Sequence, residues 1–419
     1  MTISPIRRAA GWSLALVAAL LLNLVLTRNT TLPQGAVLSA QQPHATAQPS
    51  VPWRAPSRSA GDPIDRLPPV VALPPGGDTG SGSARPQELI PLNARQAAAL
   101  QAATHRARAA FGLDALAIGV SLHGTEGWSG ASGWARDGLN RLDGSSPFAI
   151  ASITKTFTAT LTLQLVDERR LHLNDRVTDL LPGVQIPDTV RVAHLLRHTS
   201  GLADLLEPMR DELNADIERL WQPSEVIGEV PGPWFAPGLS WAYSNTNYVL
   251  LGMIIERVSG QPFATLLHQR LLDPLGMTGT GVLLSKGAPY LMAPSWASAF
   301  GTSGDMYTNA HDLLRWGDAL YGGRVLSAKA LAHMLDFRRH RYGMGAERIK
   351  VGDATGYGHS GLLRGFTSLM VHLPHRDMTL VLMGTTLMFD PATVLAYRAP
   401  GKPSILDLAE RAAAADAAA

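Results

Sequence analysis

The chain has 419 residues, of which 46% are hydrophobic, and this is the composition of an ordinary globular protein with room for a large core or two lobes. Its formal net charge of +2 and its lack of a lysine–arginine cluster argue against a nucleic-acid partner. It contains no cysteine, which excludes disulfides, thiolate catalysis and cysteine metal sites.

The first 26 residues have the pattern of an export signal or a membrane anchor. Arg7 and Arg8 precede an apolar run over residues 11–26 that Ser13 and Asn23 interrupt. A positive flank before an apolar run predicts a cytoplasmic N-terminus and an outside body. No good small-x-small cleavage site follows closely, which favours an uncleaved anchor. We therefore expect a protein of the bacterial cell envelope, anchored in the inner membrane and facing the periplasm or exterior, or secreted if the segment is cleaved.

Residues 27–92 have the composition of a disordered linker. Pro, Gly, Ser, Ala, Gln and Thr dominate the segment, and no apolar period of 2 or 3.6 is sustained. Such a segment has no apolar face to bury and cannot form a core. The sequence therefore predicts one folded domain over residues 93–419.

Within this domain, strand patterns flank a long helical block. We expect helices at residues 93–111 and 404–417, and strands at 115–123, 128–135, 343–349, 356–361, 366–373 and 378–384. Residues from about 150 to 335 read as mostly helical. The predicted class is α+β: an antiparallel sheet assembled from both ends of the chain, with the terminal helices on one face and the inserted helical lobe on the other.

The first chemical motif is Ser152-x-x-Lys155, at the start of a predicted helix. Residues three apart share one helix face, so the hydroxyl and the amine would lie one turn apart. Helix N-terminal N–H groups and the helix dipole favour a developing alkoxide, and a buried lysine could take the serine proton. The motif alone also occurs by chance, as a capped helix with a surface lysine. Lysine is rare in this chain, however, since most of its 36 basic residues are arginine.

The second motif is Tyr243-Ser-Asn245, on a loop before an apolar helical run. A phenol near an ammonium can relay a proton, and an amide can hold a substrate carbonyl or orient Lys155. Taken alone, the same residues would fit a helix N-cap beside a packed tyrosine.

The third motif is His359-Ser360-Gly361, at the end of a predicted strand. A glycine there allows a substrate backbone to approach, which makes the three residues a candidate substrate-binding segment. The backbone N–H of Leu362, together with that of Ser152, could form an oxyanion hole. His359 could bind a substrate carboxylate when protonated, with a dependence on pH near neutrality, or donate to the proton network.

Together the three motifs resemble those of the serine β-lactamase-like family, which includes class C β-lactamases, serine D-Ala-D-Ala carboxypeptidases and related serine esterases. The resemblance covers most of residues 95–390 and includes accessory stretches at 195–202, 243–260 and 272–277. It implies a β-lactamase/transpeptidase-like fold and an exported or anchored serine hydrolase that works through an acyl-enzyme. It also implies that Ser152 is acylated, that Lys155 and Tyr243 share the acid–base work, and that Asn245 contacts substrate.

The sequence leaves the substrate open among peptidoglycan-type peptides, β-lactams and small esters. Class C β-lactamases carry Lys-Thr-Gly at the third motif, and the histidine at position 359 weighs against true β-lactamase activity. The alternative function is a penicillin-recognising sensor or binding protein with little or no turnover, against which the intact motifs argue.

We expect no cofactor and no metal. His194 and His198 have a metal-ligand spacing, but no Glu follows His194, and the resemblance makes His198 a structural loop residue. The expected partners are a small-molecule or peptide substrate and, through the N-terminal segment, a membrane. The sequence does not indicate an oligomeric state.

Overall fold

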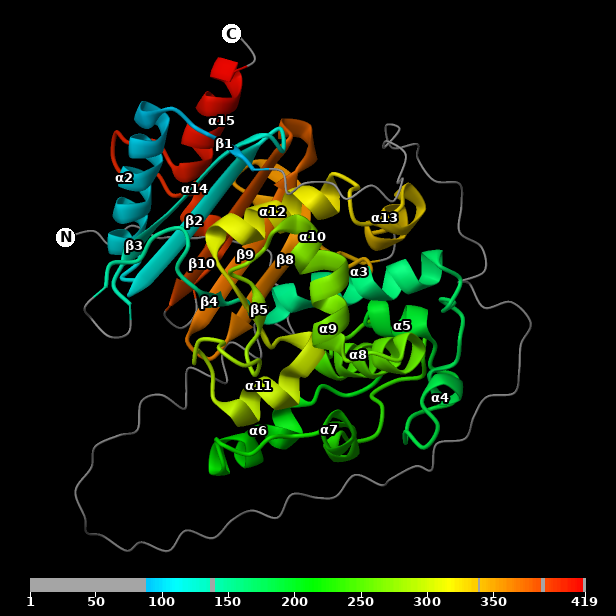
Figure 1. Ribbon diagram of the computed structural model, residues 1–419. Helices are drawn as coiled ribbons and strands as arrows, with labels where there is room; N and C mark the ends of the chain where they lie inside the picture. Colours follow the sequence, from blue (N-terminus) through cyan, green and yellow to red (C-terminus); the bar gives the residue numbers. More distant parts are fainter. Residues whose placement is uncertain (1–87, 136–139, 338–339, 386–388, 417–419) are drawn as a thin grey trace, which may run out of the picture. The chain divides into compact units, whose positions relative to one another are not determined.

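The computed structural model describes residues 88–135, 140–337, 340–385 and 389–416, and Figure 1 shows how their helices and strands are arranged. A seven-stranded sheet has the order β1-β3-β2-β10-β9-β8-β7. Its strands are β1 (Ile90–Pro91), β2 (Ala115–Leu122), β3 (Glu126–Gly133), β7 (Glu347–Val351), β8 (Ala354–Leu363), β9 (Phe366–Leu373) and β10 (Met378–Thr385). Neighbouring strands are antiparallel except β1 and β3, which are parallel. The predicted α+β fold, with one sheet built from both ends of the chain, is confirmed.

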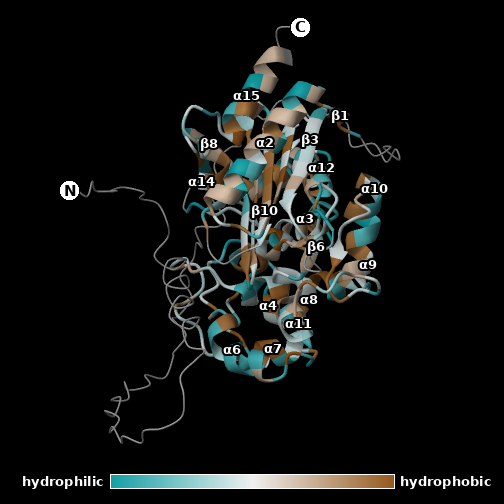
Figure 2. Cartoon of the chain, turned by 90° about the vertical axis from the view of Figure 1, so that its left-hand side faces the viewer, coloured by the Kyte–Doolittle hydropathy of each residue, from teal (hydrophilic) through white to brown (hydrophobic). Residues whose placement is uncertain are grey.

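One face of the sheet is covered by helices from the two ends of the folded part. They are α2 (Ala94–Ala110), α14 (Pro391–Ala396) and α15 (Ile405–Asp416). Figure 2 shows these helices with hydrophobic and hydrophilic residues side by side along their length, as amphipathic elements on a buried face require. α2 begins at Asn93, whose side chain accepts from the N–H of Gln96 (3.0 Å), while the Gln96 side chain accepts from the N–H of Asn93 (3.1 Å). This capping box makes Ala94 the first residue of the helix, one residue after the predicted start at position 93.

The other face carries the inserted helical lobe. Its helices are α3 (Thr154–Asp167), α4 (Val177–Leu180), α5 (Val192–Leu196), α6 (Leu206–Ala215), α7 (Pro223–Glu229), α8 (Asn245–Ser259), α9 (Phe263–Leu267), α10 (Asp273–Leu275), α11 (Pro294–Phe300), α12 (Ala310–Tyr321) and α13 (Ala328–Met334). Short helical turns are η2 (Ala151–Ile153), η3 (His268–Leu272), η4 (Gly301–Ser303) and η5 (Pro374–Arg376). A small sheet of order β4-β6-β5, which the sequence did not predict, joins Phe148–Ala149, Met306–Thr308 and Gly281–Val282.

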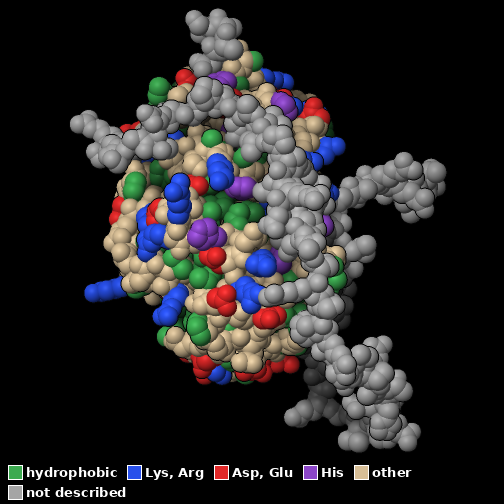
Figure 3. All heavy atoms as spheres, turned by 90° about the vertical axis from the view of Figure 1, so that its right-hand side faces the viewer, with side chains coloured by type: hydrophobic (Ala, Val, Ile, Leu, Met, Phe, Trp, Pro, Cys, Tyr) green, Lys and Arg blue, Asp and Glu red, His purple; other side chains and the backbone are tan. Residues whose placement is uncertain are grey.

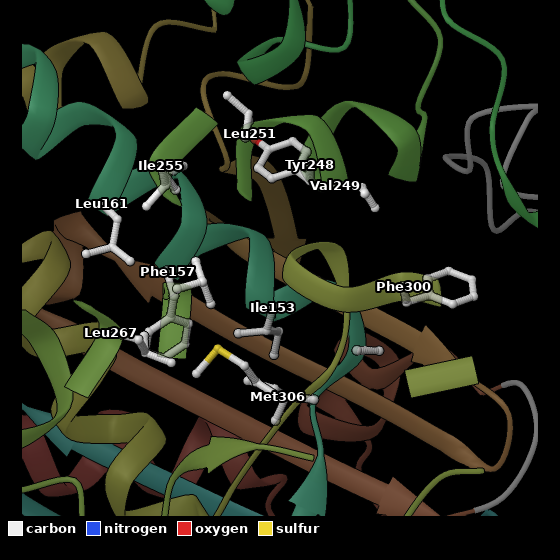
Figure 4. Packing of buried hydrophobic residues seen from close by; sticks show 14 of the residues in the cluster. Ile153, Phe157, Leu161, Tyr248, Val249, Leu251, Ile255, Leu267, Phe300 and Met306 are labelled. Carbon is white, nitrogen blue, oxygen red and sulfur yellow. The ribbon is translucent and has the colours of Figure 1, made fainter. Parts of the chain in front are cut away.

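Helix α3 passes through the middle of the lobe and is buried on every side. Figure 4 shows Ile153, Phe157 and Leu161 packed among residues of α8 and neighbouring elements. The rings of Phe157 and Trp316 stack with centroids 4.0 Å apart. The threonines of α3 can be buried because their hydroxyls donate to backbone carbonyl oxygens one turn earlier, as Thr160 does to Thr156 (2.8 Å).

Several predicted boundaries need correction, including those of β3 and β8 by two residues at each end, and two of the corrections bear on the sheet. Residues predicted at the end of the linker belong to the sheet, because the N–H of Ile90 donates to the carbonyl of Thr125 (2.7 Å) and that of Leu92 to the carbonyl of Gly127 (3.2 Å). The strand predicted at residues 343–349 begins instead at Glu347, after Gly345, whose φ of +82° turns the chain.

The predicted anchor and most of the predicted linker lie outside the described residues. In the part of the chain that the structure describes, none of the helices combines the length and the apolar character needed to cross a membrane. On the described surface seen in Figure 3, acidic and basic side chains are interspersed.

Candidate active site

Ser152 lies in the turn η2, between strand β4 and helix α3, and is partly exposed. Ala151, directly before it, has a φ of +48°. A non-glycine residue in this left-handed region stores backbone strain, and such strain persists where the surrounding structure holds the chain in place. The strained turn presents the Ser152 hydroxyl at the point where the lobe meets strand β8.

Two side chains converge on the Ser152 hydroxyl. The Nζ of Lys155 donates to Oγ (3.0 Å), and the phenol of Tyr243 donates to it from 91 positions away in the chain (2.8 Å). Lys155 also donates to Oδ1 of Asn245 (2.7 Å) and to the carbonyl oxygen of Ser303 (2.8 Å). The structure therefore brings Ser152, Lys155, Tyr243 and Asn245 together in one hydrogen-bonded cluster.

The environment of Lys155 favours its neutral form. The side chain is fully buried, and this burial lowers the pKa of the ammonium to about 7. The carboxylates of Asp204 and Glu347 act in the opposite direction and raise it. An amine with a pKa near 7 can exchange a proton at neutral pH, which an exposed lysine cannot do.

Tyr243 is held as a neutral phenol. Burial raises its pKa well above the usual value, and the hydrogen bond to Ser152 opposes this without cancelling it. The Nζ of Lys155 lies 4.9 Å from the centre of the Tyr243 ring. The phenol is therefore a proton donor toward Ser152 rather than a base in the free protein.

Asn245 is oriented by Asp204, a residue that the sequence analysis did not single out. Oδ2 of Asp204 accepts from both the backbone N–H (2.6 Å) and the side-chain NH₂ (2.9 Å) of Asn245. With its NH₂ used in this way, Asn245 turns its carbonyl oxygen to Lys155. The predicted direct contact of Asn245 with substrate remains a prediction, since the structure shows its amide between Asp204 and Lys155.

Strand β8 brings the third motif beside Ser152. A Cβ added to Gly361 would lie 2.2 Å from the carbonyl oxygen of Ile150, two residues before Ser152, so only glycine permits this approach. The β7–β8 pairing ends at Glu347 and Gly358, while β8 continues to Leu363 beside β9. Among the described strands, none covers this side of residues 359–363, and the predicted oxyanion donor Leu362 lies on this segment.

His359 does not occupy the position that a substrate-binding cation would need. Its side chain is 1% exposed, and burial together with the nearby Lys155 lowers the pKa of the imidazole to about 3. Nδ1 donates to the carbonyl oxygen of Ser360 (2.5 Å), so Nε2 accepts from the phenol of Tyr342 (3.0 Å). Burial and the neutral ring argue against the predicted role of His359 as a cation for a substrate carboxylate, and that role stays a prediction.

The structure adds four candidate functional residues that the sequence did not indicate. They are Asp204, Ser303, Tyr342 and Glu347: Asp204 and Ser303 contact the cluster, and Tyr342 and Glu347 contact the third motif. Ser303 acts through its backbone carbonyl, which no side-chain pattern reveals. Asp204 has no sequence signal beyond being a carboxylate after the accessory stretch at 195–202, and its partner lies 41 residues away.

His198, one member of the histidine pair with metal-ligand spacing, packs beneath the cluster. Its ring centre lies 4.3 Å from that of Tyr243, and its Nδ1 accepts from the N–H of Ser244 (3.2 Å). Its φ of +57° is a second non-glycine strain next to the site. This histidine supports the loop that carries Tyr243, as the structural assignment predicted.

Comparisons with known proteins agree with this geometry. The family model for β-lactamase matches residues 100–399. Penicillin-binding protein 4 of Amycolatopsis lactamdurans is 30% identical over 288 residues, which is 57% of this chain and 72% of that protein. Two further curated penicillin-binding relatives are matched over 58% and 33% of their own lengths.

Two solved structures are similar in fold and sequence. A D-stereospecific amidohydrolase from a Streptomyces species has a TM-score of 0.61 and 29% identity, covering 72% of this chain and 97% of that one. The D-amino acid amidase from Ochrobactrum anthropi SV3, complexed with L-phenylalanine, has a TM-score of 0.65 and 27% identity, covering 77% and 100%. With the family model spanning most of the chain and the serine–lysine–tyrosine cluster in place, this protein belongs to the β-lactamase family of serine hydrolases.

Proposed function

We propose that this protein hydrolyses amides or esters of small acyl groups through an acyl-enzyme on Ser152. The observation that carries the proposal is the position of Lys155. A neutral amine has two N–H donors and one lone pair. With the two donors used by Asn245 and Ser303, the lone pair faces Ser152, so in the neutral amine the 3.0 Å contact reverses and the Ser152 hydroxyl donates to Nζ.

In this mechanism Ser152 transfers its proton to Lys155 as its oxygen forms a bond to the substrate carbonyl carbon. The backbone N–H groups of Ser152 and Leu362 stabilise the negative charge on the carbonyl oxygen. The bond to the leaving group breaks as the leaving atom takes a proton from Tyr243, and Lys155 returns a proton to Tyr243. Water then attacks the acyl carbon while Lys155 takes its proton, the bond from that carbon to the Ser152 oxygen breaks, and Lys155 returns the proton to this oxygen, which frees the product acid and the Ser152 hydroxyl.

The proposed substrate class follows from the third motif and from the relatives. A buried neutral His359 supplies no cation for the carboxylate that penicillins and peptidoglycan-type peptides carry. The similar solved structures are described as amidohydrolase and amidase. These observations favour amides and esters over β-lactams and carboxypeptidase substrates, and turnover rather than a sensor role.

The test is intact-mass measurement of the full-length protein with a fluorophosphonate, a penicillin and a p-nitrophenyl ester. We expect stoichiometric fluorophosphonate labelling, many turnovers of the ester, and loss of both in Ser152→Ala. The matched control is Ser224→Ala, since Ser224 is exposed on α7. Ester turnover by Ser152→Ala at the wild-type rate would refute the proposal, and a single persistent acylation would indicate a sensor instead.

We also propose that residues 1–26 anchor the protein in the inner membrane and that the linker, which ends before strand β1 at Ile90, separates this anchor from the catalytic domain. The support is the apolar run at residues 11–26 without a nearby cleavage site. The full-length protein should stay with membranes in high salt, because apolar burial rather than charge would hold it. A mature soluble protein beginning near Gln41 or Gln48 would show that the segment is a cleaved signal.

A further inference from the structure

Glu347 places a carboxylate at the third motif, where the sequence predicts a cation at His359. It begins β7, and its carboxylate lies beside Ser360 on the side of β8 that β7 leaves open. The hydroxyl of Ser360 donates to Oε2 of Glu347 (3.1 Å), and the backbone of Ser360 also hydrogen-bonds the carboxylate. Oε1 lies 3.6 Å from Nδ1 of His359.

The side chain of Glu347 is partly exposed, whereas the neighbouring imidazole is buried. The side chain of Glu347 is 24% exposed and that of His359 is 1% exposed. A substrate group that extends along the open edge of β8 would therefore meet Glu347 and Ser360, and not His359.

The hydrogen bond from Ser360 to Glu347 determines whether the Ser360 hydroxyl can donate to a ligand or only accept from it. A serine hydroxyl has one proton and two lone pairs. Because the proton of Ser360 is used by Glu347, the hydroxyl can accept from a substrate N–H but cannot donate to a carboxylate. At pH 8, where Glu347 is above its pKa of about 7, the pair therefore presents acceptors and negative charge.

A chain of side-chain contacts through His359 and Tyr342 connects Glu347 to Tyr243. The charge of Glu347 raises the pKa of the Lys155 amine and of the Tyr243 phenol, which places it within electrostatic reach of both. Tyr342 connects the third motif to Tyr243, since its phenol donates to His359 (3.0 Å) and its ring lies 6.1 Å from that of Tyr243. In the proposed mechanism Tyr243 protonates the leaving group, so the leaving group must lie on the side of Ser152 that faces Tyr243.

We propose that Glu347, acting with Ser360, determines leaving-group specificity by excluding a carboxylate and accepting a carboxamide or an ammonium group. The inference rests on the proposed acyl-enzyme function and names the substrate class of the same site. A carboxylate beside Glu347 would be a like-charge contact, which is strongly unfavourable when partly desolvated. An amide N–H or an ammonium would find acceptors in both Glu347 and Ser360.

The test uses the full-length protein and three esters of N-acetyl-D-alanine whose alcohols are D-lactate, D-lactamide and 1-amino-2-propanol. We expect kcat/KM at about pH 8 to be at least about tenfold higher for the lactamide and ammonium esters than for the lactate ester, from one charge contact. A lactate ester cleaved as fast as the lactamide ester by the wild type would overturn the inference without any variant.

The matched variant is Glu347→Gln, which keeps the acceptor oxygen and removes the charge. It should raise the lactate-to-lactamide ratio of kcat/KM by about tenfold and lower the relative rate of the ammonium ester. Glu229→Gln, the same change on the exposed end of α7, should leave all three ratios unchanged. A ratio unmoved by Glu347→Gln would overturn the inference while Ser152→Ala still tests the proposed function separately.

Discussion

The carboxylate of Asp204 accepts both the backbone N–H and the side-chain NH₂ of Asn245, at 2.6 and 2.9 Å. This double contact fixes which end of the amide points to Lys155. The same carboxylate raises the pKa of the Lys155 amine, in opposition to burial. Asp204 therefore influences both the geometry and the protonation of the proposed base without touching Ser152.

Replacing Asp204 by Asn removes this charge and one acceptor. We expect kcat/KM for a neutral ester to fall by about tenfold to a hundredfold, because Lys155 loses its fixed partner. The pH at which activity is half-maximal should also fall, because the charge that raises the pKa of Lys155 is gone. The measurement is a pH–rate profile of Asp204→Asn beside Asp211→Asn, an exposed residue of α6. A profile identical to that of the wild type would show that Asp204 has no positioning role.

Replacing Lys155 by Arg keeps a cation but removes the base. An arginine does not lose its proton at accessible pH, so Ser152 could not transfer its proton. We expect fluorophosphonate labelling and ester turnover to slow by about 10²- to 10⁴-fold. Lys350→Arg, on the exposed side of β7, is the control and should behave as the wild type. Rapid labelling of Lys155→Arg would assign the base to another group.

The pH dependence of the wild type should follow the proton on Lys155. Burial lowers its pKa to about 7, so the free amine is absent at low pH and forms as the pH rises. We therefore expect kcat/KM for a neutral ester to increase from about pH 5 to 8 and then level off. Burial also raises the pKa of Glu347 to about 7, so the observed midpoint belongs to the interacting pair.

The variant Glu347→Gln distinguishes the contribution of Lys155 to the midpoint of the pH–rate profile from that of Glu347. It removes a charge that raises the pKa of Lys155, so the midpoint should move to lower pH. The measurement is the same pH–rate profile with the same neutral ester. A midpoint that moves to higher pH, or a wild-type midpoint near 10, would contradict the assignment of Lys155 as a buried amine.

The close approach of β8 to the turn η2 depends on Gly361. A Cβ there would lie 2.2 Å from the carbonyl oxygen of Ile150 and 2.2 Å from the hydroxyl of Ser368. Gly361→Ala should lower the free energy of unfolding by about 1 to 3 kcal/mol and reduce turnover, because β8 must move away from Ser152. Thermal unfolding and ester kinetics measure both effects. Gly228→Ala on α7, where the added Cβ meets nothing within 4 Å, should be neutral or slightly stabilising.

Short-range patterns in the sequence predicted most strands of the large sheet and the pair of Ser152 and Lys155 at the centre of the site. The strand-like composition of residues 366–373 predicted β9 with the bounds that the structure shows, and the spacing of Ser152 and Lys155 predicted that they lie one turn apart. The resemblance to a family then supplied Tyr243 and Asn245, whose contacts span 91 and 90 residues. A local sequence pattern cannot predict contacts of this range, because they depend on how α8 packs against α3.

Tertiary structure alone decided the electrostatics. His359 has an ordinary pKa as a residue type, but burial beside Lys155 makes it neutral. Glu347 appeared only as part of a strand, and the end of the β7–β8 pairing places its carboxylate at the third motif. Ala151 carries no sequence sign of its left-handed backbone. Burial, charge and strain arise from neighbours distant in the chain, so the sequence could name the chemical groups while packing set their charges and orientations.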